Sequence, residues 1–244
     1  MHRLRAEPDV LDPEQVTAAY AYPAGPWLRA NMVASADGAA MADGRTAGLS
    51  GPADQWLLGL LRGLADAVLV GSRTVQVEGY GPARTRPETA AARRAAGQSP
   101  APRLAVVSAT LGLDPQAPLF TAATEPTLVL TTGTAPAARR RDLARVAEVV
   151  IAGDAVVNLA AAVAALHERG LTRLLCEGGP RLLAGVVAAD LLDELCLTVS
   201  PRLLGGPAAR ILDGPPLPSA RPLRLAGVLA AEEFLFLRYH RAQP

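Results

Sequence analysis

The sequence predicts an α/β protein built on an open, mainly parallel sheet, with helices on both faces and antiparallel strands at its C-terminal edge. Through about residue 190, short apolar runs alternate with helix-like segments, which is the order typical of a parallel sheet. The first of these runs has the mixed apolar character expected of a central strand covered on both sides. From residue 193 onward the pattern is mostly strand, and 221–229 and 233–239 alternate as expected of an antiparallel pair.

The chain is expected to divide into an N-terminal arm, residues 1–25, and a single domain, residues 26–244. Within the arm, Asp12-Pro13-Glu14 is typical of a helix start, and the helix is expected to end at Tyr20. Half of the 244 residues are hydrophobic, so a substantial core can be buried. The expected elements are, in order, a strand at 27–34, a long loop at 35–51, a helix from 52, a strand at 67–71, mostly loop at 76–102, strands at 103–108 and 127–131, a helix at 137–145, a strand at 148–152 and a helix at 156–169.

The stretch from Leu171 to Gly185 is a candidate binding element. It predicts a short strand ending at Cys176, a glycine corner at Gly178-Gly179 and a helix beginning at Pro180, where the missing N–H of proline costs nothing. Such a corner presents free N–H groups at a helix N-terminus, where a phosphate can bind. Glu177 would meet whatever is bound there. An ordinary strand-to-helix turn is the alternative interpretation of these residues.

A second glycine corner follows the strand at 67–71, in the order Gly71-Ser72-Arg73-Thr74. In a doubly wound sheet, ligands bind outside the C-terminal ends of the strands, where Ser35, Asp37 and Ser108 are also expected. Two glycine corners, an arginine and several hydroxyls suit a ligand with more than one phosphate, and a dinucleotide is the natural candidate. The G-x-G-x-x-G fingerprint is absent, so a Rossmann assignment has no support.

Three charged residues have both a structural and a functional interpretation. Arg73 is either a solvated residue at a helix start or a clamp for a phosphate monoester, which would favour NADPH over NADH. Asp54 is either a first-turn acid that interacts with the helix dipole or a carboxylate that holds the N–H groups of a heterocycle. Arg62 is either solvent-facing or ion-paired on its helix, or a ligand for a substrate phosphate.

Composition excludes several classes of function. The net charge of +1 gives no drive towards nucleic acid or an anionic membrane. The chain contains no lysine, which excludes a Schiff base and a Walker A loop. Cys176 and Cys196 each lie in an apolar run and are expected in the core, and no Cys/His cluster has the spacing of a metal site. The first residues lack the apolar run of a signal peptide, so a cytoplasmic location is expected.

Four motifs resemble a known family: the reductase domain of bacterial riboflavin biosynthesis and, more closely, the stand-alone pyrimidine reductase proteins of actinobacteria. The resemblance covers about residues 26–210. The motifs are Asn31-Met-Val-Ala-Ser-Ala-Asp-Gly38, Leu61-Arg-Gly-Leu-Ala-Asp-Ala-Val-Leu-Val-Gly-Ser-Arg-Thr-Val75, Cys176-Glu-Gly-Gly-Pro-Arg-Leu182 and Asp193-Glu-Leu-Cys-Leu-Thr-Val-Ser-Pro-Arg-Leu-Leu-Gly-Gly206.

The resemblance implies a dihydrofolate-reductase-like fold, a homodimer, and NADPH-dependent reduction of 5-amino-6-(5-phosphoribosylamino)uracil to its ribityl form. It implies that the cofactor contacts Ala34, Gly48, Gly71, Ser72, Arg73, Thr74, Glu78, Ser108, Gly178, Gly179, Pro180, Arg181, Leu182 and Leu183. The substrate is expected near Thr46, Asp54, Arg62, Arg84 and Glu177. The acids expected to serve catalysis are Asp37, Asp54 and Glu177.

The sequence departs from the family pattern at three points. The zinc signature of the deaminase half is absent, so deamination is not expected here. The usual Asp-Asp/Asn-Pro motif after the second corner is replaced by Glu78-Gly-Tyr-Gly-Pro82, which makes Glu78 and Arg84 approximate matches. Finally, Pro52-Ala-Asp54 followed by the corner at 71–74 also resembles dihydrofolate reductase, in which a helix carboxylate holds the pteridine.

Two alternatives to the pyrimidine reductase therefore stay open. One is a reductase of dihydrofolate or another pteridine, with Asp54 as the acid that binds the pterin. The other is a protein that binds NADPH and senses it, or a metabolite, without catalysis, because Thr74 and Gly178-Gly179 predict cofactor binding and not turnover.

Overall fold

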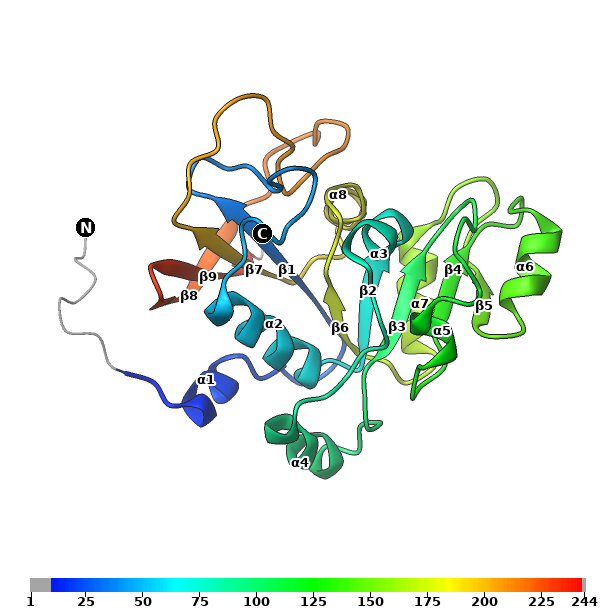
Figure 1. Ribbon diagram of the computed structural model, residues 1–244, viewed down its shortest axis with the longest axis horizontal. Coiled ribbons are helices and arrows are strands. Elements are labelled where there is room, and N and C mark those ends of the chain that lie inside the picture. Colours follow the sequence, from blue (N-terminus) through cyan, green and yellow to red (C-terminus); the bar gives the residue numbers. More distant parts are fainter. Residues whose placement is uncertain (1–9, 243–244) are drawn as a thin grey trace.

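The computed structural model describes residues 10–242, in which nine strands form one sheet in the order β5-β4-β3-β2-β6-β1-β7-β9-β8 (Figure 1). The strands are β1 (Trp27–Ser35), β2 (Ala67–Gly71), β3 (Arg103–Val107), β4 (Leu128–Thr131), β5 (Glu148–Ile151), β6 (Arg173–Cys176), β7 (Glu194–Ser200), β8 (Leu223–Ala231) and β9 (Phe234–Arg241).

Strands β1 to β7 pair in parallel, and β9 pairs antiparallel with both β7 and β8. The predicted fold class is therefore confirmed, including the antiparallel pair at the C-terminal edge. The first strand takes a central place, because β1 lies between β6 and β7. Its C-terminal end is thus beside the end of β6, which leads into the predicted Gly178-Gly179 corner.

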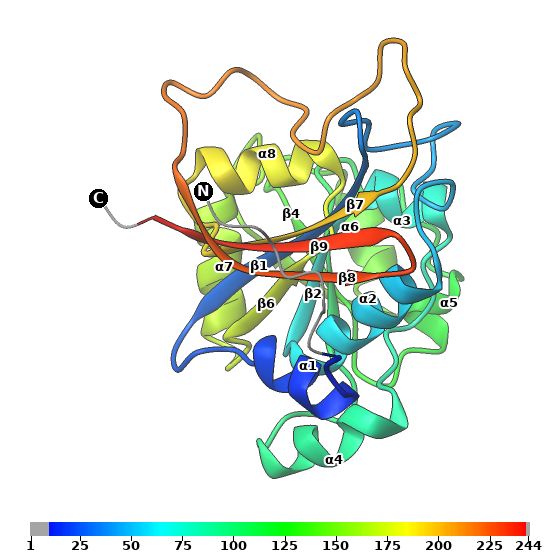
Figure 2. The same cartoon turned by 90° about the vertical axis from the view of Figure 1, so that its left-hand side faces the viewer.

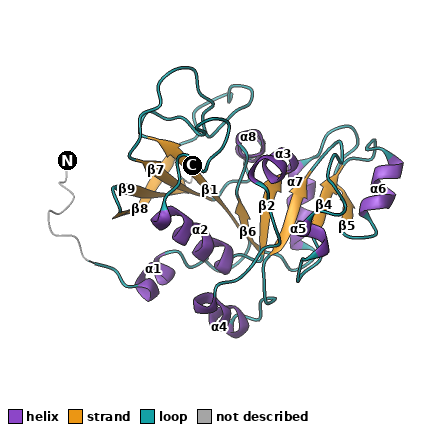
Figure 3. Ribbon diagram, in the orientation of Figure 1, coloured by secondary structure: helices purple, strands orange, loops and turns teal. Residues whose placement is uncertain are grey.

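Helices cover both faces of the sheet, as Figures 2 and 3 show. One core cluster lies under α2 (Pro52–Leu64), α3 (Ser72–Glu78), α5 (Pro118–Thr121) and α6 (Ala137–Leu143). The cluster on the other face lies under α7 (Leu159–His167) and α8 (Pro180–Ala188). The two cysteines belong to these cores as predicted, since Cys176 and Cys196 are at most 2% exposed. Burial raises the pKa of Cys176 to about 12, which keeps its thiol protonated.

Most of the stretch between residues 76 and 102 is loop, as predicted, but one helix within it was not predicted. Helix α4 (Pro87–Ala95) occupies part of this stretch. Its start has an ordinary signal, with proline in the first turn followed by Glu88. The rest of its support is tertiary: Arg93 is 1% exposed and donates hydrogen bonds to the carbonyl oxygens of Gly63, Ala65 and Ser99. A guanidinium paired in this way ties α4 to the end of α2, and such long-range partners are not visible in local sequence.

Helix α1 (Pro13–Ala19) carries the predicted cap, because the Asp12 side chain accepts a hydrogen bond from the Gln15 amide at 2.8 Å. The segment after it packs on the sheet, where the Tyr22 ring lies 4.2 Å from the Arg29 guanidinium. The cation–π contact adds to a buried ion pair between Arg29 and Glu194 at 2.9 Å. The division into an arm and a domain stays a prediction.

Candidate active site

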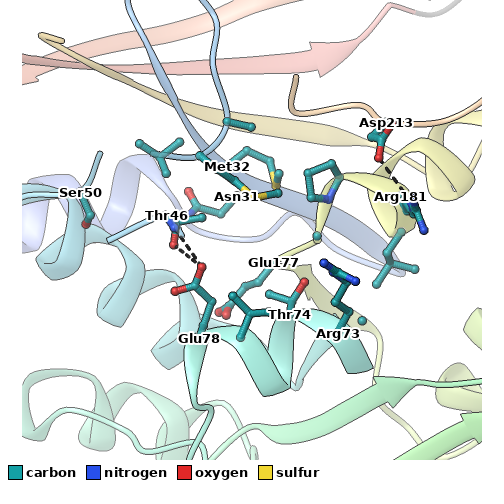
Figure 4. A pocket seen from close by; sticks show the side chains of 18 of the residues that line it. Asn31, Met32, Thr46, Ser50, Arg73, Thr74, Glu78, Glu177, Arg181 and Asp213 are labelled. Atoms are coloured by element: carbon teal, nitrogen blue, oxygen red, sulfur yellow. Dashed lines mark hydrogen bonds and ion pairs between the residues drawn. The ribbon is translucent and has the colours of Figure 1, made fainter. Parts of the chain in front are cut away.

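A cavity of about 460 Å³ opens at the C-terminal ends of β1, β2 and β6 (Figure 4). This is the edge of the sheet at which the ligand was expected, and the volume is within the usual range for small-molecule sites. The residues predicted for the site that line it are Thr46, Asp54, Gly71, Arg73, Thr74, Glu78, Glu177, Gly179, Pro180, Arg181 and Leu182.

The two predicted glycine corners form one wall. The Gly71 amide donates to the Gly178 carbonyl oxygen at 2.7 Å. Gly178 has φ +78°, a left-handed conformation that favours glycine. A Cβ atom on Gly179 would lie 2.7 Å from Thr74 Oγ1, closer than packing allows. Glycine is therefore required here by close approach, and helix α8 begins directly behind it with no side-chain cap on its free N–H groups.

One part of the cavity is acidic. Asp54, in the first turn of α2, is 6% exposed, and its Oδ2 accepts a hydrogen bond from the Ser50 hydroxyl at 2.5 Å. Glu78, at the end of α3, accepts from both the amide and the hydroxyl of Thr46, at 2.9 and 3.1 Å. Glu78 thus anchors the loop after β1, which is a structural role beside the cofactor-binding role that was expected for it.

Glu177 lies at the centre of a second polar group. Its carboxylate accepts two hydrogen bonds from Arg62, from Nε at 2.7 Å and from Nη2 at 2.6 Å, and a third from the Tyr80 hydroxyl at 2.5 Å. Burial disfavours the charge on Arg62, but the Glu177 carboxylate outweighs this and raises the pKa of Arg62 above its usual value. Burial, followed by the charge of Glu177, raises the pKa of Tyr80 well above its usual value.

The opposite part of the cavity is basic. Arg73 projects from the first turn of α3, and Arg181 from the first turn of α8, as Figure 4 shows. Arg181 pairs with Asp213 at 3.3 Å, on exposed side chains where such a pair contributes little. Arg73 forms no ion pair with any of residues 10–242, so its guanidinium and the start of α8 make this part of the cavity suitable for phosphate groups.

The expected catalytic role of Asp37 is not supported by its position, because Asp37 does not line the cavity. Its exposed carboxylate accepts hydrogen bonds from the Ser35 hydroxyl at 2.5 Å and from the amides of Leu204 and Gly205 at 3.1 and 2.7 Å. These bonds, led by that from Ser35, lower the pKa of Asp37 to about 2. Asp37 joins the end of β1 to the loop after β7.

Other predicted residues also lie outside the lining. Ser108 accepts a hydrogen bond from the Leu111 amide at 3.0 Å, which closes the turn after β3. Leu183 is 1% exposed and belongs to the core beneath α8. Arg62 does not line the cavity but contacts two residues that do, Glu177 and Tyr80, and Arg84 is exposed on the surface. The lining also lacks four further predicted residues: Ala34, Gly48, Ser72 and Gly178.

The lining also includes residues for which no role was expected. They come from β1, the loop after it, the helices and the segment after β7: Asn31, Met32, Val33, Ala40, Met41, Gly44, Ser50, Leu58, Val77, Tyr80 and Asp213. The lining residues of β1 could have been predicted, because they come just before Ser35, which the sequence places at the ligand-binding end of that strand. Asp213 could not, because its segment reaches the site only through tertiary structure.

Two kinds of feature, a membrane-spanning helix and a metal-binding cluster, are absent from residues 10–242, the part of the chain that the structure describes. No helix there has the length and apolar character needed to cross a membrane. The same residues contain no group of three or more His, Cys, Asp or Glu side chains placed to hold a metal ion.

Comparison with known proteins points to one family. The family model described as the RibD C-terminal domain matches residues 26–235. A 2,5-diamino-6-ribosylamino-4(3H)-pyrimidinone 5′-phosphate reductase of Archaeoglobus fulgidus is 30% identical over 182 residues, which cover 74% of this chain and 83% of the relative. Reductases with the same description from Methanothermobacter thermautotrophicus and Aquifex aeolicus match shorter stretches.

Solved structures agree with this match. The chain superposes on a pyrimidine reductase-like protein of Corynebacterium diphtheriae with a TM-score of 0.81 and 28% identity, covering 90% of this chain and 93% of that one. A riboflavin biosynthesis reductase of Saccharomyces cerevisiae shares the fold, with a TM-score of 0.67 at 15% identity, over 89% and 90% of the two chains.

Proposed function

We propose a reductase function for this chain, which belongs to the RibD C-terminal domain family. The proposed reaction is NADPH-dependent reduction of a ribosylaminopyrimidine 5′-phosphate to its ribityl form. The observation that carries the proposal is the division of the cavity into an acidic part and a basic part beside two glycine corners. The acidic part suits a base rich in N–H groups, and the basic part suits phosphates.

The cofactor assignment rests on the basic part. The contact between the corners at Gly71 and Gly178 brings the start of α8 next to Thr74 and Arg73. Free N–H groups at a helix N-terminus bind phosphate oxygens, and a guanidinium can bind a phosphate monoester in a bidentate manner. We infer that Arg73 binds the 2′-phosphate of NADPH, which makes NADPH the preferred cofactor over NADH.

The substrate assignment rests on Asp54. A buried carboxylate needs donors, and Ser50 supplies only one of them. The base of 2,5-diamino-6-ribosylamino-4(3H)-pyrimidinone 5′-phosphate, named in the relatives, offers an N–H and an adjacent amino group to a carboxylate. The uracil expected from the sequence carries a carbonyl oxygen in place of that amino group, which would repel the carboxylate. We therefore propose the diaminopyrimidinone as the substrate.

The chain's own residues orient and enclose the reactants. When bound, NADPH supplies the hydride that adds to C1′ of the opened sugar. Gly179 and the side chains of Met32 and Leu182 form the wall that positions the reactants, and Asp54 fixes the base. Glu177 places a negative charge in the same wall, where positive charge on the substrate would be stabilised.

The test is a comparison of three substrates by NADPH oxidation: the diaminopyrimidinone, the uracil and dihydrofolate, each with wild type and Asp54→Asn. We expect wild type to prefer the diaminopyrimidinone, and Asp54→Asn to lose roughly tenfold to a hundredfold in kcat/KM with it, as for the loss of a charged hydrogen bond. With the uracil as substrate, kcat/KM should fall by a smaller factor in Asp54→Asn. Turnover of dihydrofolate alone would contradict the proposal and favour the pteridine reductase. Tight NADPH binding without oxidation of any substrate would favour the sensor.

A homodimer and a cytoplasmic location remain part of the proposal. Exposed apolar side chains gather in the C-terminal region, with Leu203 78% and Leu225 51% exposed, and the edge strand β8 carries some of them. Such a surface favours association with a second copy. Light scattering of the purified protein distinguishes a dimer from a monomer of 25.2 kDa.

A further inference from the structure

Tyr80 lines the cavity at a position where the sequence departs from the family motif. Gly79 ends α3 in a left-handed conformation, at φ +66°, and the Tyr80 amide then turns back to donate to the Val75 carbonyl oxygen at 3.0 Å. This turn directs the Tyr80 hydroxyl towards Glu177, at 2.5 Å from Oε2. The Arg62 guanidinium lies 5.3 Å from the centre of the Tyr80 ring.

The Glu177 carboxylate is therefore held by three donors. Arg62 approaches it with two nitrogens, a bidentate geometry that fixes orientation as well as charge. The Glu177 side chain is 4% exposed, so little of its surface is open to competing water. Burial and the charge of Glu177 raise the pKa of Tyr80, so the phenol keeps its proton and acts as a hydrogen-bond donor and not as an acid.

We propose that Tyr80 and Arg62 are positioning residues that hold the Glu177 carboxylate in one orientation in the cavity wall. This inference rests on the proposed function. It gives Arg62 a different role from that of a substrate phosphate ligand, because the edge of the guanidinium formed by Nε and Nη2 binds Glu177 in a bidentate manner. Opening of the ribosylamine would break the C1′–O bond, place a proton on the ring oxygen and develop positive charge on the C1′–N unit that then accepts the hydride. A fixed carboxylate would stabilise that charge as it forms.

A double-mutant cycle tests whether Tyr80 acts through Glu177. Tyr80→Phe removes only the hydroxyl, and we expect kcat to fall roughly tenfold to a hundredfold, as for the loss of a hydrogen bond to a charged group. In the Glu177→Gln background the same change should alter kcat by less than about threefold, because the charge on which it acts is gone. An equal loss in both backgrounds, or no loss in either, would overturn the inference.

The role of Arg62 is tested with a substrate that lacks the phosphate. In Arg62→Met we expect kcat to fall, while the preference for the phosphorylated substrate over its dephosphorylated form stays within about twofold of wild type, because Arg62 acts through a carboxylate. Arg62→Lys should recover part of the rate, since it keeps the charge and loses the bidentate geometry. Collapse of the phosphate preference in Arg62→Met would show a direct phosphate contact and would overturn this role.

A readout without turnover separates this inference from the proposed function. Crystal structures of wild type and of the Tyr80→Phe/Arg62→Met double variant report the orientation of the Glu177 carboxylate directly. We expect the carboxylate to lose its single orientation in the double variant, because all three of its donors are gone. An unchanged orientation would overturn the inference, whereas a wild type that reduces no pyrimidine would overturn only the proposed function.

Tyr22→Phe is the matched control for these measurements. The Tyr22 hydroxyl also donates a hydrogen bond, to the Leu174 carbonyl oxygen at 3.2 Å, but it lies outside the cavity lining. We expect this variant to lose some thermal stability and to keep kcat. A loss of kcat in Tyr22→Phe as large as that in Tyr80→Phe would mean that the rate responds to general loosening of the fold, and would overturn the specific role of Tyr80.

Discussion

The Gly71 amide donates a hydrogen bond to the carbonyl oxygen of Gly178 at 2.7 Å, which joins two glycine corners that lie far apart in the sequence. Each corner alone is compatible with an ordinary turn between a strand and a helix. Their contact follows from strand order, because β2 and β6 are neighbours in the sheet and end at the same edge. The joined corners then form a continuous wall of a cavity that also receives the ends of three helices.

Replacement of Gly179 should weaken cofactor binding. A Cβ atom at this position would lie 2.7 Å from Thr74 Oγ1, so Gly179→Val must push the two corners apart. We expect NADPH affinity, measured by fluorescence titration, to fall at least about tenfold in a folded variant, since one misplaced phosphate contact costs on that order. The control is Gly227→Val, because no atom lies within 4 Å of a Cβ there. Unchanged affinity in Gly179→Val would remove this corner from the cofactor site.

Arg73 should set the choice of cofactor. Its side chain is exposed at the start of α3 and lines the cavity, where a 2′-phosphate can reach it. We expect Arg73→Gln to lower kcat/KM with NADPH roughly tenfold or more and to change that with NADH little, because only NADPH carries the phosphate. Steady-state kinetics with both cofactors measure the ratio. Arg141→Gln, exposed on α6, is the control, and an unaltered ratio in Arg73→Gln would refute the assignment.

The ion pair between Arg29 and Glu194 should be important for stability. Both side chains are 1% exposed, and Glu194 also accepts a hydrogen bond from the Trp27 indole at 2.8 Å. Glu194→Gln leaves the Arg29 charge buried without its counter-charge, which typically costs about 3–5 kcal/mol. We expect a marked fall in Tm by calorimetry. Asp142→Asn, which removes an exposed pair, should change stability by no more than about 0.5 kcal/mol, and equal effects would contradict the prediction.

Asp37 should hold the loop after β7 down to low pH. The pKa of Asp37 is lowered from 3.8 to about 2 by hydrogen bonds from Ser35, Gly205 and Leu204. A lowered carboxyl pKa means that the anchor is fully present above pH 3.8 and is lost as the pH falls through about 2. NMR amide shifts of Leu204 and Gly205 should follow that titration and should be constant with pH in Asp37→Asn. A midpoint near the ordinary value would contradict this arrangement.

The sequence by itself determined the elements whose signals are local. The apolar runs predicted the strands, and the proline and glycine positions predicted the starts of α2 and α8 and both corners, because backbone preferences act over a few residues. Asp54 could likewise be placed in the first turn of its helix from its neighbours alone. Membership in the family was predicted from motifs and was confirmed by the match over residues 26–235.

Only the tertiary structure decided what each polar side chain faces. Asp37 follows a strand at the ligand edge, as predicted, yet its carboxylate turns to the loop after β7. Arg62 and Tyr80 both bind Glu177, and none of the three is near another in sequence. The physical reason is that a hydrogen bond or ion pair across the sheet depends on strand order and side-chain direction, which arise from packing of the whole chain. The stability of turns and helix ends depends on a few neighbouring residues, so local sequence predicts them. Which side chain pairs with a charged residue depends on the fold of the whole chain.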